Sequence, residues 1–207
     1  MRRLLTILTL MASGLIAAQG ATAHGGHNHG SDRVETRSVS ASAGDERARA
    51  YFTDTVLVDH TGRSVKFYSD VLEGRTVVIS FIFTTCPDAC PLINATLERV
   101  QDRLRDRIGK DIVIVSITVD PENDTVAVLS DYRKKFKAMD GWIFLTGTTR
   151  NIETVSQKLG QVFERDAHLT ALLVGNTRTA RWRKIPAHLS DAIIAGQIRD
   201  IADDVWN

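Results

Sequence analysis

The stretch TVVISFIFT at residues 76–84, followed at once by TCPDACP at residues 85–91, carries the clearest structural signal in the chain. The first part is a nearly continuous run of β-branched and aromatic residues, which predicts a strand buried on both faces. The residues after it recur at helical spacing and predict a helix over 91–108, with Ile93, Leu97, Val100, Leu104 and Ile108 on one side. The two cysteines, Cys86 and Cys90, therefore follow the carboxyl end of a buried strand, where open α/β sheets place their sites.

Outward from this junction the chain alternates short apolar runs with segments of helical period. Strands are expected at 55–58 and 64–68 around an Asp59-His60-Thr61-Gly62 turn, and at 112–119, 142–145, 169–174 and 179–184. Helices are expected at 125–136, through Ile152, Val155, Leu159 and Val162, and after Ser190 through Ile194, Ile198, Ile201 and Val205. This order predicts a layered α/β fold with a mixed central sheet, an N-terminal β-hairpin and a late antiparallel strand pair.

Composition narrows the function classes. The 207 residues are 43% hydrophobic and 25% charged, which is the composition of a folded domain and excludes disorder throughout. Lys and Arg number 26 against 25 Asp and Glu, for a formal net charge of +1. Because this balance leaves no basic field for a phosphate backbone, we do not expect a nucleic-acid partner.

The N-terminal region predicts export. Arg2 and Arg3 precede an apolar run at residues 4–18 that is shorter than the ~20 residues a membrane-spanning helix needs, and Ala21-Thr22-Ala23 fits a signal-peptidase site. We therefore expect a signal peptide at 1–23, a disordered histidine-containing linker at 24–49, one domain at 50–207 and a periplasmic location. The alternative is an uncleaved N-terminal anchor in the inner membrane.

The pair Cys86 and Cys90 is too small for a disulfide scaffold, so these residues are expected to act together and locally. Spacing of four residues brings both sulfurs to one face of a helical turn. This arrangement allows a disulfide, a two-thiolate grip on a soft metal, or two inert buried thiols.

The run FTTCPDACP at residues 83–91 resembles the C-P-x-x-C-P signature of the SCO/SenC family, thioredoxin-fold proteins that help to assemble the copper centre of cytochrome c oxidase. The resemblance extends over roughly residues 50–205. It includes the segment from Ser116 to Pro121, followed by Asp124-Thr125, and a histidine, His168, just before the late strand pair.

The resemblance implies a thioredoxin-like fold and a copper site formed by Cys86, Cys90 and His168. Two thiolates and one imidazole form a soft donor set, which favours copper over calcium, magnesium or manganese. Asp120, at the end of a buried strand, is either a residue that orients the site or an ordinary turn residue before Pro121. The implied partners are a copper-enzyme subunit as recipient and a periplasmic thiol reductant or an upstream copper donor.

Several positions depart from the family pattern, among them Ala167 and Leu169 beside the histidine and Asn123 in the acidic loop, so the recipient is left open. The rival function is a thiol–disulfide oxidoreductase with Cys86 and Cys90 as its redox pair. Against this function, no proline lies directly before the expected late strand at Leu169, where thioredoxin-like reductases usually have a cis proline.

Three histidines near the expected mature N-terminus, His24, His27 and His29, form a candidate accessory copper site. The alternative is a polar tail that binds metals only loosely. His60 is expected in the hairpin turn and His188 on the surface before the last helix.

Overall fold

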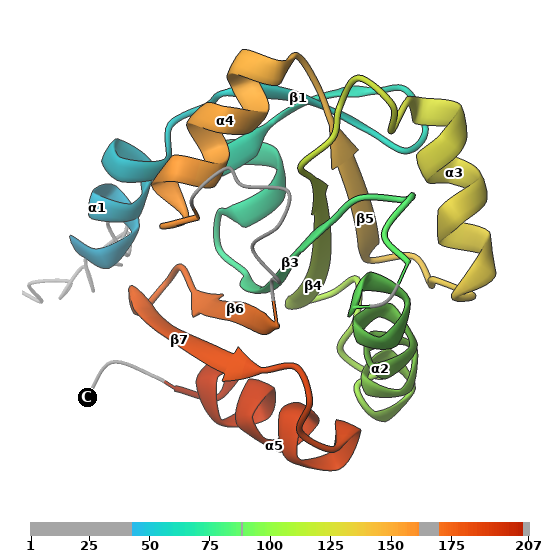
Figure 1. Cartoon of the computed structure of the whole chain (residues 1–207). Coiled ribbons are helices and arrows are strands. Elements are labelled where there is room, and N and C mark those ends of the chain that lie inside the picture. Colours follow the sequence, from blue (N-terminus) through green and yellow to red (C-terminus); the bar gives the residue numbers. More distant parts are fainter. Residues whose placement is uncertain (1–42, 88, 162–169, 205–207) are drawn as a thin grey trace, which may run out of the picture. The chain divides into compact units, whose positions relative to one another are not determined.

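The computed structural model describes residues 43–87, 89–161 and 170–204, which form a seven-stranded mixed sheet with helices on both faces (Figure 1). The spatial order of the strands is β2-β1-β5-β4-β3-β6-β7, with β3, β4 and β5 parallel and the outer pairs antiparallel. This confirms the predicted fold class. The strands are β1 (Val56–Asp59), β2 (Ser64–Lys66), β3 (Thr76–Ile82), β4 (Ile112–Thr118), β5 (Trp142–Thr146), β6 (Ala171–Asn176) and β7 (Arg181–Pro186).

The helices begin where the sequence supplies caps. Hydroxyl groups of Thr125, Thr148 and Ser190 accept hydrogen bonds from backbone N–H groups of the first turns of α3, α4 and α5, which satisfies donors that a helix start otherwise leaves unpaired. The helical segments are α1 (Ala43–Phe52), the short π-helical η1 (Phe67–Leu72), α2 (Ala89–Arg103), α3 (Val126–Lys135), α4 (Thr149–Lys158) and α5 (Asp191–Ala202).

Every residue of β3 and β4 is buried, because the sheet is covered on both faces. Along β3, Val78 and Ile82 join one core with α2, α3 and α5, whereas Val77, Ile79 and Phe81 join a second core with α1, η1 and α4. Alternate side chains of a strand point to opposite faces, so one run of apolar residues supplies both cores. Burial of each large side chain stabilises the fold by about 1.5–3 kcal/mol.

Helix α1 corrects the expected domain start. Residues 43–49 were assigned to the linker, but they form most of α1, and Ala48 and Phe52 pack in the second core. Arg49 also donates to Ser69 and pairs with Glu73. The described residues all belong to one compact unit that spans Ser38–Asn207. Few large apolar residues occur in α1, so its burial depends on partners distant in sequence.

The two hairpins differ from their expected bounds. Strand β2 ends at Lys66, before residue 68, because Phe67 and Tyr68 turn into η1 and become fully buried. The late pair is shifted by two residues, to Ala171–Asn176 and Arg181–Pro186 instead of 169–174 and 179–184. Gly175 pairs with Trp182 across the ladder, and a Cβ at Gly175 would lie 2.3 Å from the Trp182 ring. The ring occupies the space that a larger residue would need.

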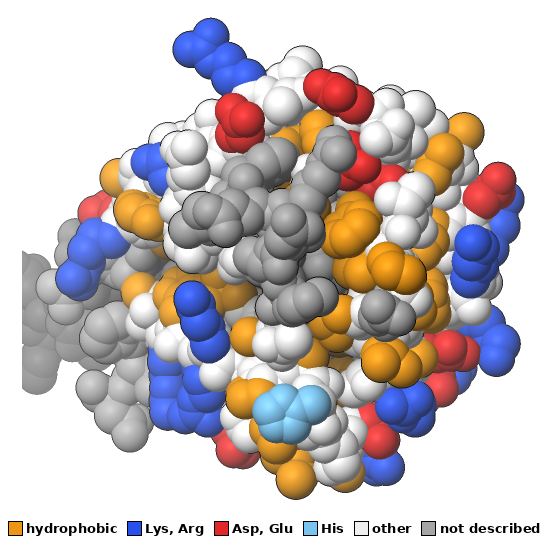
Figure 2. All heavy atoms as spheres, in the orientation of Figure 1, with side chains coloured by type: hydrophobic (Ala, Val, Ile, Leu, Met, Phe, Trp, Pro, Cys, Tyr) orange, Lys and Arg blue, Asp and Glu red, His pale blue; other side chains and the backbone are white. Residues whose placement is uncertain are grey.

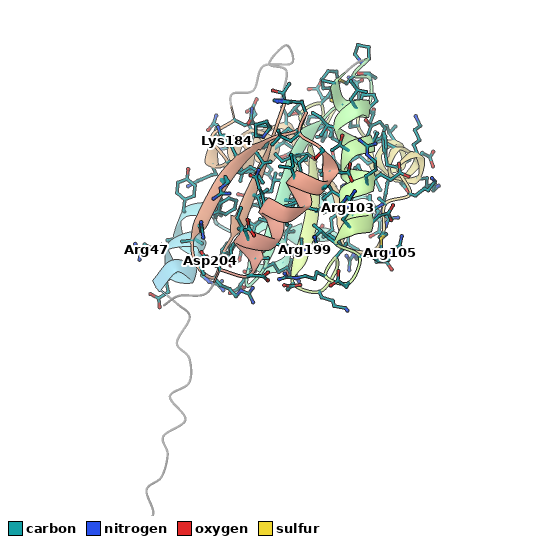
Figure 3. The ribbon with its side chains drawn as sticks, turned by 90° about the horizontal axis from the view of Figure 1, so that it is seen from below. Arg47, Arg103, Arg105, Lys184, Arg199 and Asp204 are labelled. Carbon is teal, nitrogen blue, oxygen red and sulfur yellow. The ribbon has the colours of Figure 1, made fainter. Side chains whose placement is uncertain are left out.

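Helices α2 and α5 lie side by side on one face of the sheet (Figures 1 and 3). On the side seen in Figure 3, Arg103 of α2 pairs with Asp191, and Arg199 of α5 donates to the backbone oxygen of Arg103. These contacts hold the two helices together at their solvent edge. Within the described ranges, no helix combines the length and the apolar character needed to cross a membrane.

Candidate metal centre

The two cysteines lie at the carboxyl edge of the parallel strands. Strands β3 and β4 pair in register from Thr76 with Ile112 to Ile82 with Thr118, so both end at the same edge of the sheet (Figure 1). Cys86 lies in the loop after β3 and is half-buried, and Cys90 lies in the first turn of α2 with 6% of its surface exposed. The two sulfurs are not joined in a disulfide.

A hydrogen bond joins the two cysteine positions. The backbone N–H of Cys90 donates to Cys86 Sγ over 3.3 Å, and the N–H of Cys86 donates to the oxygen of Phe83 over 3.1 Å. The Cys86 sulfur therefore accepts a hydrogen bond from the first turn of α2, as the side chain of a helix cap does. The positive end of the α2 dipole therefore lies at the Cys86 sulfur.

Cys90 lies in an environment of the opposite character. Burial, followed by the hydrogen bond with Cys86, raises the pKa of the Cys90 thiol to about 12, and a backbone contact with Phe83 partly opposes this rise. Negative charge at Cys86 and Asp124 adds to the rise. The pair thus consists of a more exposed sulfur at Cys86 and a buried, protonated sulfur at Cys90.

A buried carboxylate, Asp124, holds the cysteine loop to the sheet. It is fully buried and accepts hydrogen bonds from the Thr84 N–H (3.2 Å), the Thr84 hydroxyl (2.5 Å) and the Thr118 hydroxyl (2.5 Å). Thr84 lies in the loop after β3, and Thr118 ends β4. No separate role is predicted for Asp124 from the sequence, because its position just before the α3 cap does not reveal burial.

Asp120 is also buried, with 5% of its surface exposed. Its carboxylate accepts hydrogen bonds of 3.1 and 2.9 Å from the Asn123 side chain, and its backbone oxygen accepts from the N–H groups of Asn123 and Asp124. These contacts build the turn between β4 and α3. They match the turn interpretation, while a role in orienting the site stays a prediction.

A second polar pair that the sequence analysis did not identify lies one turn beyond Cys90. The Asn94 side-chain N–H donates to the Tyr132 hydroxyl over 3.1 Å, and both residues are buried. Burial raises the pKa of Tyr132 to about 12, the bond from Asn94 opposes the rise, and charges at Cys90, Cys86 and Asp124 add to it. Tyr132 lies within the helix expected at 125–136 and is a buried residue of α3.

The remaining candidate ligands fall into two groups. His168, His24, His27 and His29 lie outside the described residues, so their roles stay predictions. His60 lies in the turn after β1, where its Nδ1 accepts from the Phe144 N–H over 3.3 Å, and His188 is exposed before α5. No set of three or more histidine, cysteine or acidic side chains suited to a metal occurs within residues 43–87, 89–161 and 170–204. Of the proposed copper ligands, Cys86 and Cys90 are the ones that lie in the described part of the chain.

The fold and this junction define a thioredoxin-like α/β protein with a dithiol at the carboxyl edge of its central sheet. The SCO1/SenC family model matches residues 43–201, and the chain belongs to this family. The expected family is confirmed, and the match begins at the start of α1, well before residue 50.

Curated relatives agree with this assignment. The SCO2-like protein of Rickettsia felis is 39% identical over 113 residues, which cover 54% of this chain and 52% of that protein. A putative copper-binding protein of Stutzerimonas stutzeri is 34% identical over 107 residues, covering 52% and 50%. The chain spans about half the length of the curated relatives it matches.

Solved structures share the fold. Arabidopsis thaliana ScoI with copper bound has a TM-score of 0.60 and 24% identity, covering 72% of this chain and 96% of its own. Yeast Sco1 with copper bound has a TM-score of 0.60 and 22% identity, covering 73% and 91%. At these identities the likeness establishes the thioredoxin-like fold.

Proposed function

We propose that this protein binds one copper ion through Cys86, Cys90 and His168 and delivers it to a copper-enzyme subunit, such as the copper centre of cytochrome c oxidase. The observation that carries the proposal is the pair of cysteines at the β3–α2 junction, which form no disulfide and are linked by the 3.3 Å contact between the Cys90 N–H and Cys86 Sγ. Two adjacent sulfurs are soft donors, the type that Cu(I) prefers. Family membership and the copper-bound relatives support the choice of metal.

The two sulfurs have separate tasks in this proposal. Cys86 is the more exposed, so the cargo ion enters and leaves at its sulfur. Cys90 is buried and its pKa is raised to about 12 by that burial, so its thiol keeps its proton in the metal-free protein. Copper binding must therefore release this proton, because the thiolate is the metal ligand. The reverse proton uptake favours release of the ion to a recipient.

The loop around the sulfurs is held in place before the ion arrives. Asp124 fixes Thr84 by two contacts, and Thr84 lies two residues before Cys86. A positioned donor set loses less conformational freedom on binding than a flexible one. We propose that Asp124 positions the cysteine loop. Asp120 remains a second candidate for orienting the site.

We further propose that the protein acts after export. The signal peptide at 1–23 would be removed, leaving His24 as the first residue of the periplasmic protein, and His24, His27 and His29 would bind copper as an accessory site. Retention by an uncleaved N-terminal anchor is the alternative. Both forms place the dithiol outside the cytoplasm, where an unoccupied pair is prone to oxidation.

A second candidate function is thiol–disulfide oxidoreductase. The contrast between a half-exposed Cys86 and a buried Cys90 favours it, because an exposed sulfur can attack a partner while a buried one resolves the mixed disulfide. This activity would prime the thiols of the same recipient.

A copper titration of the reduced protein tests the first function. Cys86→Ala and Cys90→Ala should each abolish tight Cu(I) binding, and His168→Ala should weaken it and change the Cu(II) spectrum. His188→Ala is the matched control, since this exposed histidine is not a proposed ligand. Unchanged affinity in the His168 variant would remove that residue from the site.

Thiol chemistry separates the two functions. Copper-loaded protein should resist oxidation and thiol labelling, because both sulfurs are occupied, whereas the metal-free dithiol should close to a Cys86–Cys90 disulfide. Insulin reduction by the metal-free protein should be slow. Rapid turnover of insulin disulfides would favour the oxidoreductase over the copper carrier.

A further inference from the structure

A groove of about 460 Å³ runs beside the cysteines, between α2 and the segment that leads from β7 into α5. We call it the α2–α5 groove. Its buried lining includes Ile93, Thr96 and Ala187, and Leu92 lies at its rim.

The rim of this groove exposes large apolar side chains. Leu92 is 71% exposed, and Ile193, in the first turn of α5, is 50% exposed. Ile193 follows Ser190, which lines the groove, by three residues, and its backbone N–H donates to the Ser190 hydroxyl. Figure 2 shows hydrophobic side chains gathered over the start of α2 and the loop before it. Exposed apolar side chains gathered in this way are a feature of interaction sites.

The groove is continuous with the dithiol. Ala89, which lines it, is the immediate neighbour of Cys90 in the first turn of α2. Thr170 lines the opposite wall and follows the segment that holds the predicted ligand His168. A partner bound at the dithiol therefore lies beside this groove.

The charges at the groove favour an acidic partner. Its ionisable lining residues are Arg99 and His188, and no carboxylate lines it among the described residues. Asp191, the first residue of α5, lies 3.6 Å from Arg99 and also pairs with Arg103, and both of these arginines belong to α2. Two guanidinium groups face one carboxylate, so this end of the groove carries net positive charge. Arg99 is 56% exposed, which leaves its charge accessible.

We propose that the α2–α5 groove binds an apolar side chain of the acidic polypeptide segment with which Cys86 and Cys90 exchange copper or a disulfide. The inference rests on the proposed function, whose dithiol it extends. Ile93 and Thr96 lie three and six residues after Cys90, or about 5–9 Å along a helix. An extended strand covers that length in two or three residues. The apolar anchor of the partner thus lies two or three residues from its reactive cysteine or metal ligand.

A peptide assay on the reduced, metal-free full chain tests this. The probe is Glu-Leu-Gly-Cys-Gly-Leu-Glu with its cysteine capped as a mixed disulfide with thionitrobenzoate. Leucine on both sides allows either chain direction. The matched probes replace both leucines by serine, or both glutamates by lysine, and capped free cysteine reports the intrinsic reactivity of the dithiol.

The reaction is a balanced exchange. The Cys86 thiolate attacks the peptide sulfur, a mixed disulfide forms, and thionitrobenzoate leaves with the electron pair and is measured by its absorbance. Cys90 then gives its proton to solvent and attacks the Cys86 sulfur, which forms the Cys86–Cys90 disulfide and releases the peptide thiolate. One dithiol is oxidised and one disulfide is reduced.

We expect the leucine peptide to react about tenfold faster than the serine peptide, since part of a leucine side chain becomes buried. The lysine version should be slower than the glutamate version at low salt, with a smaller difference at high salt. Leu92→Glu should abolish the preference for the leucine peptide over the serine peptide. Because these two peptides carry the same charge, the charge added by the glutamate affects both rates equally and does not change their ratio. Val128→Glu, the same class of change at an exposed residue of α3, should keep it.

Equal rates for the leucine and serine peptides with the native protein would overturn the groove as a docking site, as would a preference that survives Leu92→Glu. If capped free cysteine does not react and the reduced protein binds no copper, the proposed function itself fails and the groove inference fails with it. Reactivity toward capped cysteine without peptide preference overturns only the groove.

Discussion

Removing the Thr84 hydroxyl tests the anchoring of the cysteine loop by Asp124. Thr84→Val keeps the shape of the side chain and deletes the 2.5 Å hydrogen bond to the fully buried Asp124 carboxylate. A hydrogen bond to a charged group contributes about 1.5–3 kcal/mol. We therefore expect the free energy of unfolding to fall by about 2 kcal/mol. For a domain of this size that corresponds to a decrease in Tm of about 4–8 °C.

The assay is urea unfolding followed by tryptophan fluorescence, with the midpoint and slope measured for each variant. Thr154→Val is the matched control, because Thr154 of α4 is half-buried like Thr84 and its hydroxyl donates to a neutral acceptor, the Arg150 backbone oxygen, over 2.8 Å. Its cost should stay near or below 1 kcal/mol. Equal losses in the two variants would refute the claim that the Asp124 carboxylate anchors this loop.

Other expected outcomes concern the β6–β7 hairpin, acid stability and export. Gly175→Ala should lower the Tm, because its Cβ would lie 2.3 Å from the Trp182 ring, and an unchanged Tm would contradict this packing. Arg107 lowers the pKa of Asp111 through a side-chain hydrogen bond, so the pair adds stability above the ordinary carboxyl pKa, and this is lost as the pH falls through the lowered value. Urea midpoints between pH 6 and 3 should fall less steeply for Asp111→Asn. Mass spectrometry of exported protein should find His24 as the first residue; full-length protein in the membrane fraction would exclude cleavage.

The central elements were predictable because their burial is complete. Strands β3 and β4 are buried on both faces, so nearly every position is apolar and the pattern reads as a strand in any context. The caps Thr125 and Ser190 act within three residues of sequence, at the positions from which the two helices were expected to start. Signals of this kind are local, and tertiary contacts only reinforce them.

Elements whose stability comes from distant partners were predicted less well. Helix α1 was assigned to the linker because only packing against η1 and α4 makes a helix there favourable. Phe67 looked like the end of a strand, yet it turns into η1 so that it and its neighbour Tyr68 can be fully buried. Apolar character alone does not say which element buries a residue.

For the site, the sequence by itself determined the chemistry. The two cysteines, their spacing and their place after a buried strand were all readable, since they depend on residue identity and local period. Only the tertiary structure decided the environment of each sulfur: a half-buried Cys86 that accepts an N–H group, and a Cys90 whose pKa is raised by burial. Burial and charge at a sulfur depend on residues such as Asp124, which lies 34 positions beyond Cys90 in the chain and comes close only when β3 and β4 pair side by side.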